Sequence, residues 1–171
     1  MSKIGIFYGS DTGNTEKIAI MINNIIGKKK SNIYNISEIY KNDIEKYDKI
    51  LLGISTWYYG EAQCDWDDFF PILKKIDFKN KICSIFGCGD QKNYPEYFCD
   101  AMGILGNIIK LRGANIVGKW STKGYNFIYS KCLINKDYFI GLAIDEDTQP
   151  ELTYLRTKIW VNKIIKEMNI N

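Results

Sequence analysis

The chain has 171 residues, which suits one domain with its own hydrophobic core, so we expect residues 1–171 to fold as a single unit. Its formal net charge of +3 is too small, and its lysines are too scattered, to indicate a nucleic-acid partner. The absence of histidine excludes catalytic triads that use this base, and also histidine-ligated haem or zinc. Any chemistry is therefore expected to come from a bound cofactor.

The cysteines and the hydropathy pattern bear on location. The five cysteines include no Cys-x-x-Cys pair, so we expect reduced thiols, no metal centre and a cytoplasmic protein. No apolar stretch approaches the length needed to cross a bilayer, and the N-terminus has no apolar signal core. We therefore predict no membrane insertion.

Apolar runs and helical spacings alternate along the chain. Buried strands are predicted at 4–8, 50–54, 82–86, 116–117 and 139–144, with a weaker edge strand at 33–36. Helical spacing of apolar residues follows at 18–26, with Gly27 as its stop, and returns at 161–168. Pro71 should end or kink a helix near that position. The segment 120–138 has no clear period and is predicted to be a long inserted loop.

The first strand is followed by a loop suited to phosphate. Its seven residues, Gly9-Ser10-Asp11-Thr12-Gly13-Asn14-Thr15, offer three hydroxyls, two glycines and no basic side chain. Glycines let successive backbone N–H groups point inward, and the helix that follows contributes the positive end of its dipole. The loop matches neither the P-loop nor the dinucleotide fingerprint, and a polar turn with a helix cap is the plainer alternative.

Two further loops follow the third and fourth predicted strands. One contains Thr56-Trp57-Tyr58-Tyr59-Gly60, and the other contains Cys88-Gly89-Asp90 and Tyr94. In a doubly wound parallel sheet of order 2-1-3-4-5, the loops after the first, third and fourth strands meet at one crevice. The three loops are therefore expected to form one ligand site.

The glycine-rich loop resembles the FMN phosphate loop of flavodoxins, and three longer segments resemble long-chain bacterial flavodoxins. These segments are residues 56–70 (TWYYGEAQCDWDDFF), 86–103 and 141–153. The resemblance implies an α/β fold with a doubly wound five-stranded parallel sheet, helices on both faces, and a long loop that splits the fifth strand. That loop would account for 120–138.

The resemblance also implies the cofactor and its contacts. Trp57 and Tyr94 look like the two planes that sandwich the flavin ring of non-covalently bound FMN, and Asp90 matches the position that contacts the ring edge. Tyr58, Tyr59 and Tyr97 have a weaker claim, with core or rim packing as an equal alternative. The predicted cofactor-binding residues are Ser10, Asp11, Thr12, Gly13, Asn14, Thr15, Thr56, Trp57, Tyr58, Tyr59, Gly60, Cys88, Gly89, Asp90, Tyr94, Tyr97 and Asp147.

As a member of this family, the chain would be a monomeric, low-potential one-electron carrier rather than an enzyme. The resemblance implies that it takes electrons from a flavodoxin/ferredoxin-NADP reductase and passes them to acceptors such as radical S-adenosylmethionine enzymes. Acidic residues cluster near the predicted site, at 61–68 and 145–151, and would disfavour negative charge on the reduced flavin. The net charge departs from the acidic family pattern and weakens long-range steering.

Two other functions are compatible with the predicted topology. An FMN-dependent quinone reductase would need an open substrate pocket over the flavin ring, which two covering aromatic residues oppose. A phosphorylated receiver domain would need an acidic cluster after the first strand and an Asp after the third. Tyr8-Gly9-Ser10 and Ser55-Thr56 occupy these positions instead, so phosphoryl transfer is not expected.

Overall fold

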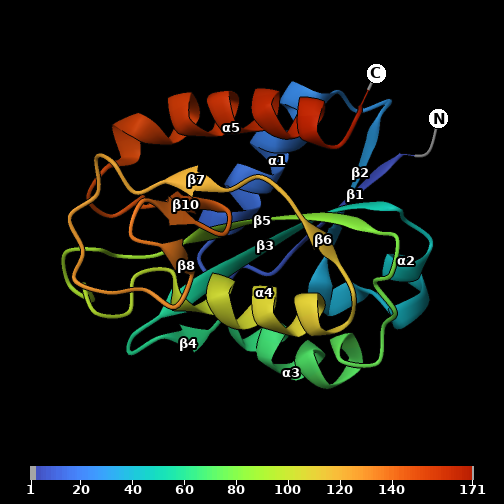
Figure 1. Ribbon diagram of the computed structural model, residues 1–171, viewed down its shortest axis with the longest axis horizontal. Helices are drawn as coiled ribbons and strands as arrows, with labels where there is room; N and C mark the ends of the chain where they lie inside the picture. The colour runs from blue at the N-terminus through green and yellow to red at the C-terminus, as the bar shows by residue number, and fades with distance from the viewer. Residues whose placement is uncertain (1–2, 171) are drawn as a thin grey trace.

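The computed structural model describes residues 3–170 and has a parallel sheet at its centre (Figure 1). The main strands are β1 (Ile4–Tyr8), β2 (Ser31–Asn35), β3 (Lys49–Trp57), β5 (Ile82–Cys88) and β10 (Leu142–Ile144). They lie side by side in the order β2-β1-β3-β5-β10, which confirms the predicted order 2-1-3-4-5. A short strand, β4 (Glu61–Ala62), pairs antiparallel with the end of β3.

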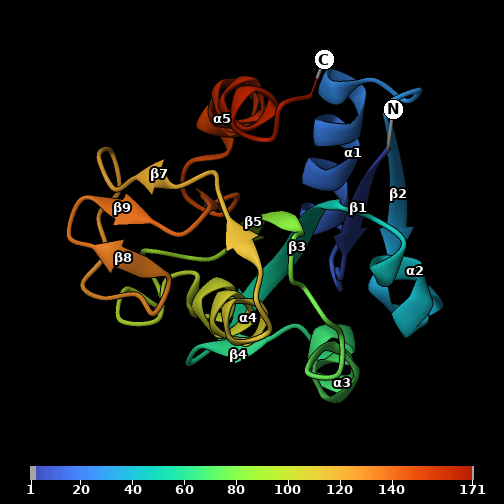
Figure 2. The ribbon, with the colours of Figure 1, turned by 45° about the vertical axis from the view of Figure 1, so that its right-hand side comes forward.

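Helices cover both faces of the sheet, as predicted (Figure 2). One face carries α1 (Asn14–Ile26) and α5 (Thr153–Glu167), which bury one hydrophobic cluster against the strands. The opposite face carries α3 (Cys64–Leu73) and α4 (Asp100–Leu111), over a second cluster. Because both faces are covered, the central strands carry continuous buried runs instead of alternating buried and exposed residues. Shorter helical segments are Ile36–Glu38, α2 (Lys41–Glu45) and Pro150–Leu152.

Local sequence explains where the helices begin and end. In α1, Ile18, Ile22 and Ile26 are buried along one face, and Gly27 ends the helix with a φ of 104°. Pro71 lies inside α3, which ends two residues later at Leu73. Among residues 3–170, no helix combines the length and apolar character that a bilayer crossing needs.

An insertion splits the fifth strand of the sheet. The first half of this strand, β6 (Asn115–Ile116), pairs with β5 at Ile82 and Cys83. The second half, β10, pairs with β5 from Phe86 to Cys88. The insertion between them is not an irregular loop. It forms an antiparallel sheet of order β7-β9-β8 from β7 (Trp120–Ser121), β8 (Leu133–Asn135) and β9 (Tyr138–Phe139).

The continuous strand predicted at 139–144 is wrong in its first part. Phe139 belongs to β9, and only Leu142–Ile144 joins the main sheet. The Phe139 ring packs edge-on against Tyr125 and Phe98, with centroid distances of 5.2 and 5.9 Å. This aromatic packing holds Phe139 in the core of the insertion, so the apolar run of the sequence spans two different sheets.

Candidate functional site

The loops after β1, β3 and β5 meet at the carboxyl ends of these strands, as the strand order requires. They surround a cavity of about 430 Å³ that also reaches the segment after β10. The residues that line it are Ser10, Asp11, Thr12, Asn14, Thr15, Ser55, Thr56, Trp57, Tyr58, Cys88, Gly89, Asp90 and Asp147. Of the predicted site residues, five lie outside this lining: Gly13, Tyr59, Gly60, Tyr94 and Tyr97.

Sequence reasoning missed one lining residue, Ser55. It lies at the end of β3 and is mostly buried, and it pairs across the sheet with Cys88. Alternation along β3 from the predicted Trp57 could have found it, because residues two apart on a strand share a face.

The glycine-rich loop is shaped by its own hydrogen bonds. The Gly13 N–H donates to Ser10 Oγ at 3.0 Å, and Gly13 has a φ of 92°, a conformation that favours glycine. Helix α1 begins at the next residue, Asn14, so its first N–H groups lie beside the loop. The buried Thr15 hydroxyl donates a weak bond to Cys88 Sγ at 3.7 Å. Among the described residues, no Lys or Arg lines the cavity, so an anion would be held by N–H and hydroxyl groups.

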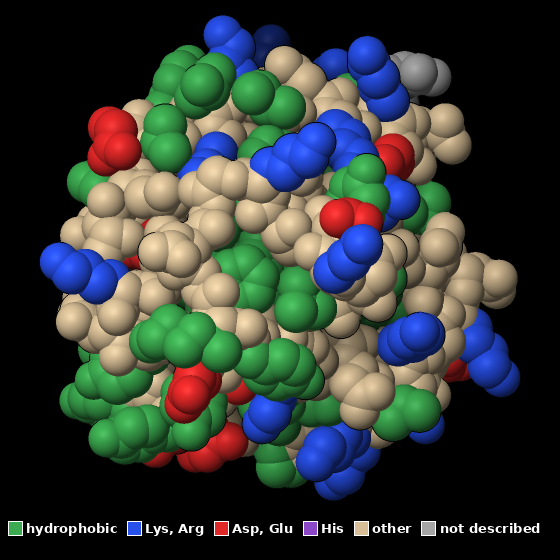
Figure 3. Space-filling model, turned by 60° about the vertical axis from the view of Figure 1, so that its left-hand side comes forward, with side chains coloured by type: hydrophobic (Ala, Val, Ile, Leu, Met, Phe, Trp, Pro, Cys, Tyr) green, Lys and Arg blue, Asp and Glu red, His purple; other side chains and the backbone are tan. Residues whose placement is uncertain are grey.

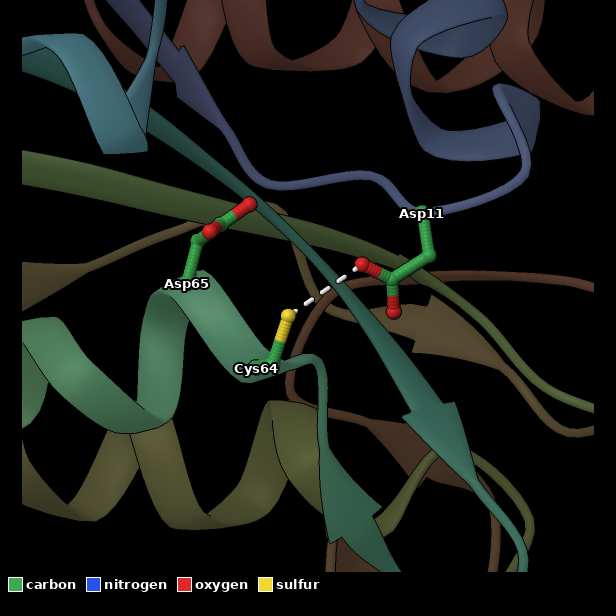
Figure 4. Close-up of side chains that lie close together, drawn as sticks. All are labelled: Asp11, Cys64 and Asp65. Carbon is green, nitrogen blue, oxygen red and sulfur yellow. Dashed lines mark hydrogen bonds between the residues drawn. The ribbon is translucent and has the colours of Figure 1, made fainter.

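Two carboxylates and a thiol, those of Asp11, Asp65 and Cys64, lie close together between this loop and the start of α3 (Figure 4). The Cys64 thiol donates to Asp11 Oδ1 at 3.4 Å, and the buried Gln63 amide donates to both Asp11 and Asp65, at 2.9 and 2.7 Å. The hydrogen bond to Asp11 raises the pKa of the Cys64 thiol. The cluster therefore ties the loop after β1 to the start of α3 through a protonated thiol and a shared amide.

The aromatic residues form a connected group that reaches the cavity through Trp57 and Tyr58. The Tyr58 ring contacts both Trp57 and Tyr94, with centroid distances of 6.0 and 6.2 Å. Tyr59 packs edge-on against Tyr94 and Tyr97, at 6.0 and 5.7 Å. Trp57 Nε1 is buried and has no hydrogen-bond partner among residues 3–170. An unpaired buried indole N–H is costly, so this donor is available to a ligand in the cavity.

Two acidic side chains, those of Asp90 and Asp147, line the cavity beside the loop after β5 and the segment after β10. The Asp90 carboxylate accepts from the backbone N–H groups of Lys92 and Asn93, at 3.0 and 2.8 Å, so it also builds its own turn. Desolvation raises the pKa of Asp147, and the negative charges of Asp90 and other nearby acids raise it further. The site therefore already disfavours additional negative charge.

One more predicted residue, Gly60, lies in the turn between β3 and β4 that also contains Tyr58 and Tyr59. It is buried, and its φ of 90° favours glycine. A Cβ at Gly60 would lie 2.7 Å from Asp100 Oδ2, so the turn packs directly on α4. Gly60 therefore shapes the turn and does not contribute to the cavity wall.

Comparison with known proteins agrees with this geometry. The family model for flavodoxin matches residues 6–160. Flavodoxin 1 of Escherichia coli (strain K12) is 57% identical over 171 residues, which are 100% of this chain and 97% of that protein. The flavodoxin of Klebsiella pneumoniae is also 57% identical, over 99% of this chain and 97% of that protein.

The structural comparison gives the same result. The crystal structure of Fusobacterium nucleatum flavodoxin bound to flavin mononucleotide superposes with a TM-score of 0.91 at 34% identity. The match covers 98% of this chain and 99% of that one. A family match over most of the chain, together with full-length relatives, establishes that this chain belongs to the flavodoxin family, in its long-chain bacterial group.

Proposed function

We propose that this flavodoxin carries single electrons on a non-covalently bound FMN that occupies the cavity at the ends of β1, β3 and β5. The observation that carries the proposal is the composition of the cavity wall. The loop after β1 contributes hydroxyls and backbone N–H groups, and the loops after β3 and β5 contribute the aromatic rings of Trp57 and Tyr58 and the acid Asp90. A phosphate attached to a flat, electron-accepting ring matches this division. The relative from Fusobacterium nucleatum was crystallised with the same cofactor.

The residues present fit FMN. The buried N–H of Trp57 has no partner within residues 3–170, and a phosphate or hydroxyl oxygen would satisfy it. The hydroxyls of Ser10, Thr12 and Thr15 are assigned to the phosphate, together with the loop N–H groups. Ser10 Oγ already accepts from Gly13, so its own hydrogen remains free to donate. Asp11 and Asn14 line the same end of the cavity.

Trp57 and Tyr94 are assigned to opposite faces of the flavin ring. Tyr58 contacts both rings in the structure, so we expect its side chain to move when a flat ring enters. Each stacked face would contribute on the order of 1 kcal/mol beyond area burial. Gly60, Tyr59 and Tyr97 shape this end of the site. Thr56, Cys88, Gly89, Asp90 and Asp147 line the remaining wall.

FMN supplies the ability to accept and release electrons one at a time. The contribution of the protein is electrostatic. A carboxylate about 7 Å from an added negative charge costs roughly 2 kcal/mol at an effective dielectric near 20. Asp90 and Asp147 line the cavity, where desolvation raises the pKa of Asp147 and the negative charge of Asp90 raises it further. We therefore expect a low potential for the second electron, at about 59 mV for each tenfold change in affinity.

A flavodoxin exchanges electrons with redox partner proteins. We propose a flavodoxin/ferredoxin-NADP reductase as the donor and low-potential enzymes, such as radical S-adenosylmethionine enzymes, as acceptors. One face of the molecule suits such contacts: hydrophobic side chains gather at its lower left with acids among them, whereas Lys and Arg dominate its right (Figure 3). We further propose a monomer in the cytoplasm, without nucleic-acid or membrane partners, which agrees with the five free cysteines.

A quinone reductase of the same fold is not favoured. Such an enzyme needs one open ring face for its substrate. Here Tyr58 lines the cavity and belongs to a connected aromatic group with Tyr59, Tyr94 and Tyr97, which we expect to cover the flavin ring. Steady NAD(P)H oxidation by the purified protein and a quinone, without a partner protein, would be the contrary result.

The decisive experiment is reconstitution followed by reduction. The apoprotein is titrated with FMN while flavin fluorescence is followed, and the complex is then titrated anaerobically with dithionite. We expect quenching with one FMN per chain and two separate one-electron steps. An apoprotein that is folded by circular dichroism, yet leaves the fluorescence of excess FMN unchanged, would falsify the proposal.

A further inference from the structure

A buried carboxyl outside the cavity has one oxygen without a partner. Asp100 is the first residue of α4 and is 0% exposed. Its Oδ2 is one of three buried side-chain polar atoms that have no hydrogen-bond partner among residues 3–170. Leaving such an atom unpaired costs about 1–3 kcal/mol, so its position calls for a physical reason.

The unpaired oxygen lies against the turn that follows Trp57. A Cβ at Gly60 would be 2.7 Å from Oδ2 and 3.3 Å from the Asp100 Cβ. The carboxyl therefore packs on the glycine backbone without room for a larger residue. Tyr58 on the same turn has a φ of 45°, which is unusual for a residue with a side chain. The turn is thus held in a special conformation directly above a buried acid.

The other carboxyl oxygen connects α4 to the insertion that splits the fifth strand. The Lys131 N–H donates to Asp100 Oδ1 at 2.7 Å. The next residue of the helix, Ala101, donates its N–H to Thr56 Oγ1 at 3.0 Å, and Thr56 lines the cavity. The first turn of α4 is therefore bound to the insertion on one side and to the end of β3 on the other.

A role in the helix dipole alone does not explain this placement. An acid in the first helical turn is stabilising when it remains in solvent, where its charge needs no burial. Burial instead raises the pKa of Asp100, and the Lys131 N–H and charge oppose that rise. The other titratable groups beside it are the buried thiols of Cys99 and Cys132, whose own pKa values are raised by burial.

We propose that Asp100 is a positioning residue of the flavin site, which joins the insertion to the Tyr58–Gly60 turn and places a buried negative charge beneath that turn. This inference rests on the proposed binding of FMN. Through Asp100, the insertion sets the position of the turn that covers the flavin. The buried charge opposes the negative charge added with the second electron, because low dielectric strengthens such repulsion.

The test compares Asp100→Asn with Glu96→Gln. Both variants remove one negative charge from the same segment, but Glu96 is exposed. Both one-electron potentials of the FMN-loaded proteins are measured by anaerobic titration, and amide resonances of Gly60 and Lys131 are recorded by NMR in the apoproteins. If Asp100→Asn does not fold, Asp100→Ser removes the charge and keeps an acceptor for the Lys131 N–H.

We expect Asp100→Asn to favour the second electron by about tenfold, or about 59 mV, and to shift both amide resonances. For Glu96→Gln we expect an effect of about twofold or less, because solvent screens an exposed charge. A second-electron shift in Asp100→Asn no larger than in Glu96→Gln would overturn the inference, as would unchanged Gly60 and Lys131 resonances. Failure of the wild-type chain to bind FMN would instead overturn the proposed function.

Discussion

The loop after β1 and the turn after β3 line the same cavity but are built differently. The β1 loop is held by polar contacts: the Gly13 N–H donates to Ser10 within the loop, and the buried Gln63 amide at the start of α3 donates to Asp11. The β3 turn instead contains Tyr58 at a φ of 45°, an exposed Tyr59, and Gly60 above an unpaired carboxyl oxygen. The first region is preorganised for an anion. The second stores strain and unsatisfied polarity, which suits a segment that adjusts to its ligand.

The largest expected effect comes from the aromatic turn. Trp57→Ala should weaken FMN binding on the order of 100-fold, because it removes a stacking face, buried area and an unpaired N–H donor. Fluorescence titration of the apoprotein measures the loss. Tyr40→Ala is the matched control, since Tyr40 is 81% exposed and does not line the cavity. Equal affinities for the two variants would show that the Trp57 indole is not a flavin contact.

The next effect compares one glycine from each region. Gly13 and Gly60 have nearly equal φ values of 92° and 90°, so alanine at either position costs about 1–2 kcal/mol of folding free energy. A Cβ at Gly13 meets nothing within 4 Å, whereas at Gly60 it meets Asp100 Oδ2 at 2.7 Å. We therefore expect Gly60→Ala to be more destabilising than Gly13→Ala by about 1 kcal/mol or more in urea unfolding of the apoproteins.

A double variant isolates the contact behind that difference. Asp100→Ala removes the clashing oxygen and keeps only the Cβ at 3.3 Å, so in this background most of the extra cost of Gly60→Ala over Gly13→Ala should disappear. If the extra cost of Gly60→Ala persists without the carboxyl, its source is the turn itself and the contact with Asp100 has no energetic weight.

A substitution at the phosphate end of the cavity should weaken the binding of FMN but not that of riboflavin. Thr15→Val removes a buried hydroxyl from the cavity wall and should weaken FMN binding by about tenfold. Riboflavin lacks the phosphate, so its affinity should be unchanged. Thr157→Val makes the same chemical change in α5, outside the cavity, and should leave both affinities unaltered. Equal losses for FMN and riboflavin would place the Thr15 hydroxyl away from the phosphate.

The sequence predicts these two regions unequally, and the reason is the range of their contacts. The glycine-rich loop can be identified from its local pattern, because its glycines, its hydroxyls and the Gly13–Ser10 bond lie within a few residues. Its bond from Gln63 to Asp11 spans 52 residues but is not needed to recognise the loop. The main strands are equally visible, because buried parallel strands are continuous apolar runs. Asp100 is different: its bond to Lys131 spans 31 residues, and its contact with Gly60 depends on how α4 packs. No local pattern marks it.

The insertion shows the same limit. Its strands are two or three residues long, which is too short for a period to appear in the sequence. The run from Phe139 to Ile144 looks like one buried strand, and only tertiary packing divides it between two sheets. Alternation could have added Ser55 to the site, whereas Asp100 required the assembled fold.

The smallest expected effect is a pH dependence that separates the buried acid from an exposed one. Burial raises the folded-state pKa of Asp100 above its ordinary value of 3.8, so the folded chain binds this proton more tightly than the unfolded chain. The associated stability is fully present below pH 3.8 and is lost as the pH rises through the folded-state pKa. The Asp100→Asn variant has no carboxyl to ionise at this position, so it does not lose this stability as the pH rises.

The stability of the Asp100→Asn apoprotein relative to wild type should therefore increase from pH 4 to pH 7. Urea unfolding at a series of pH values measures this difference. The exposed Glu96→Gln variant should follow wild type across the same range, because its charge remains in solvent in both states. Parallel curves for Asp100→Asn and wild type would mean that the carboxyl under Gly60 is hydrated in the apoprotein. In that case the contrast between the two regions would lie in backbone conformation alone.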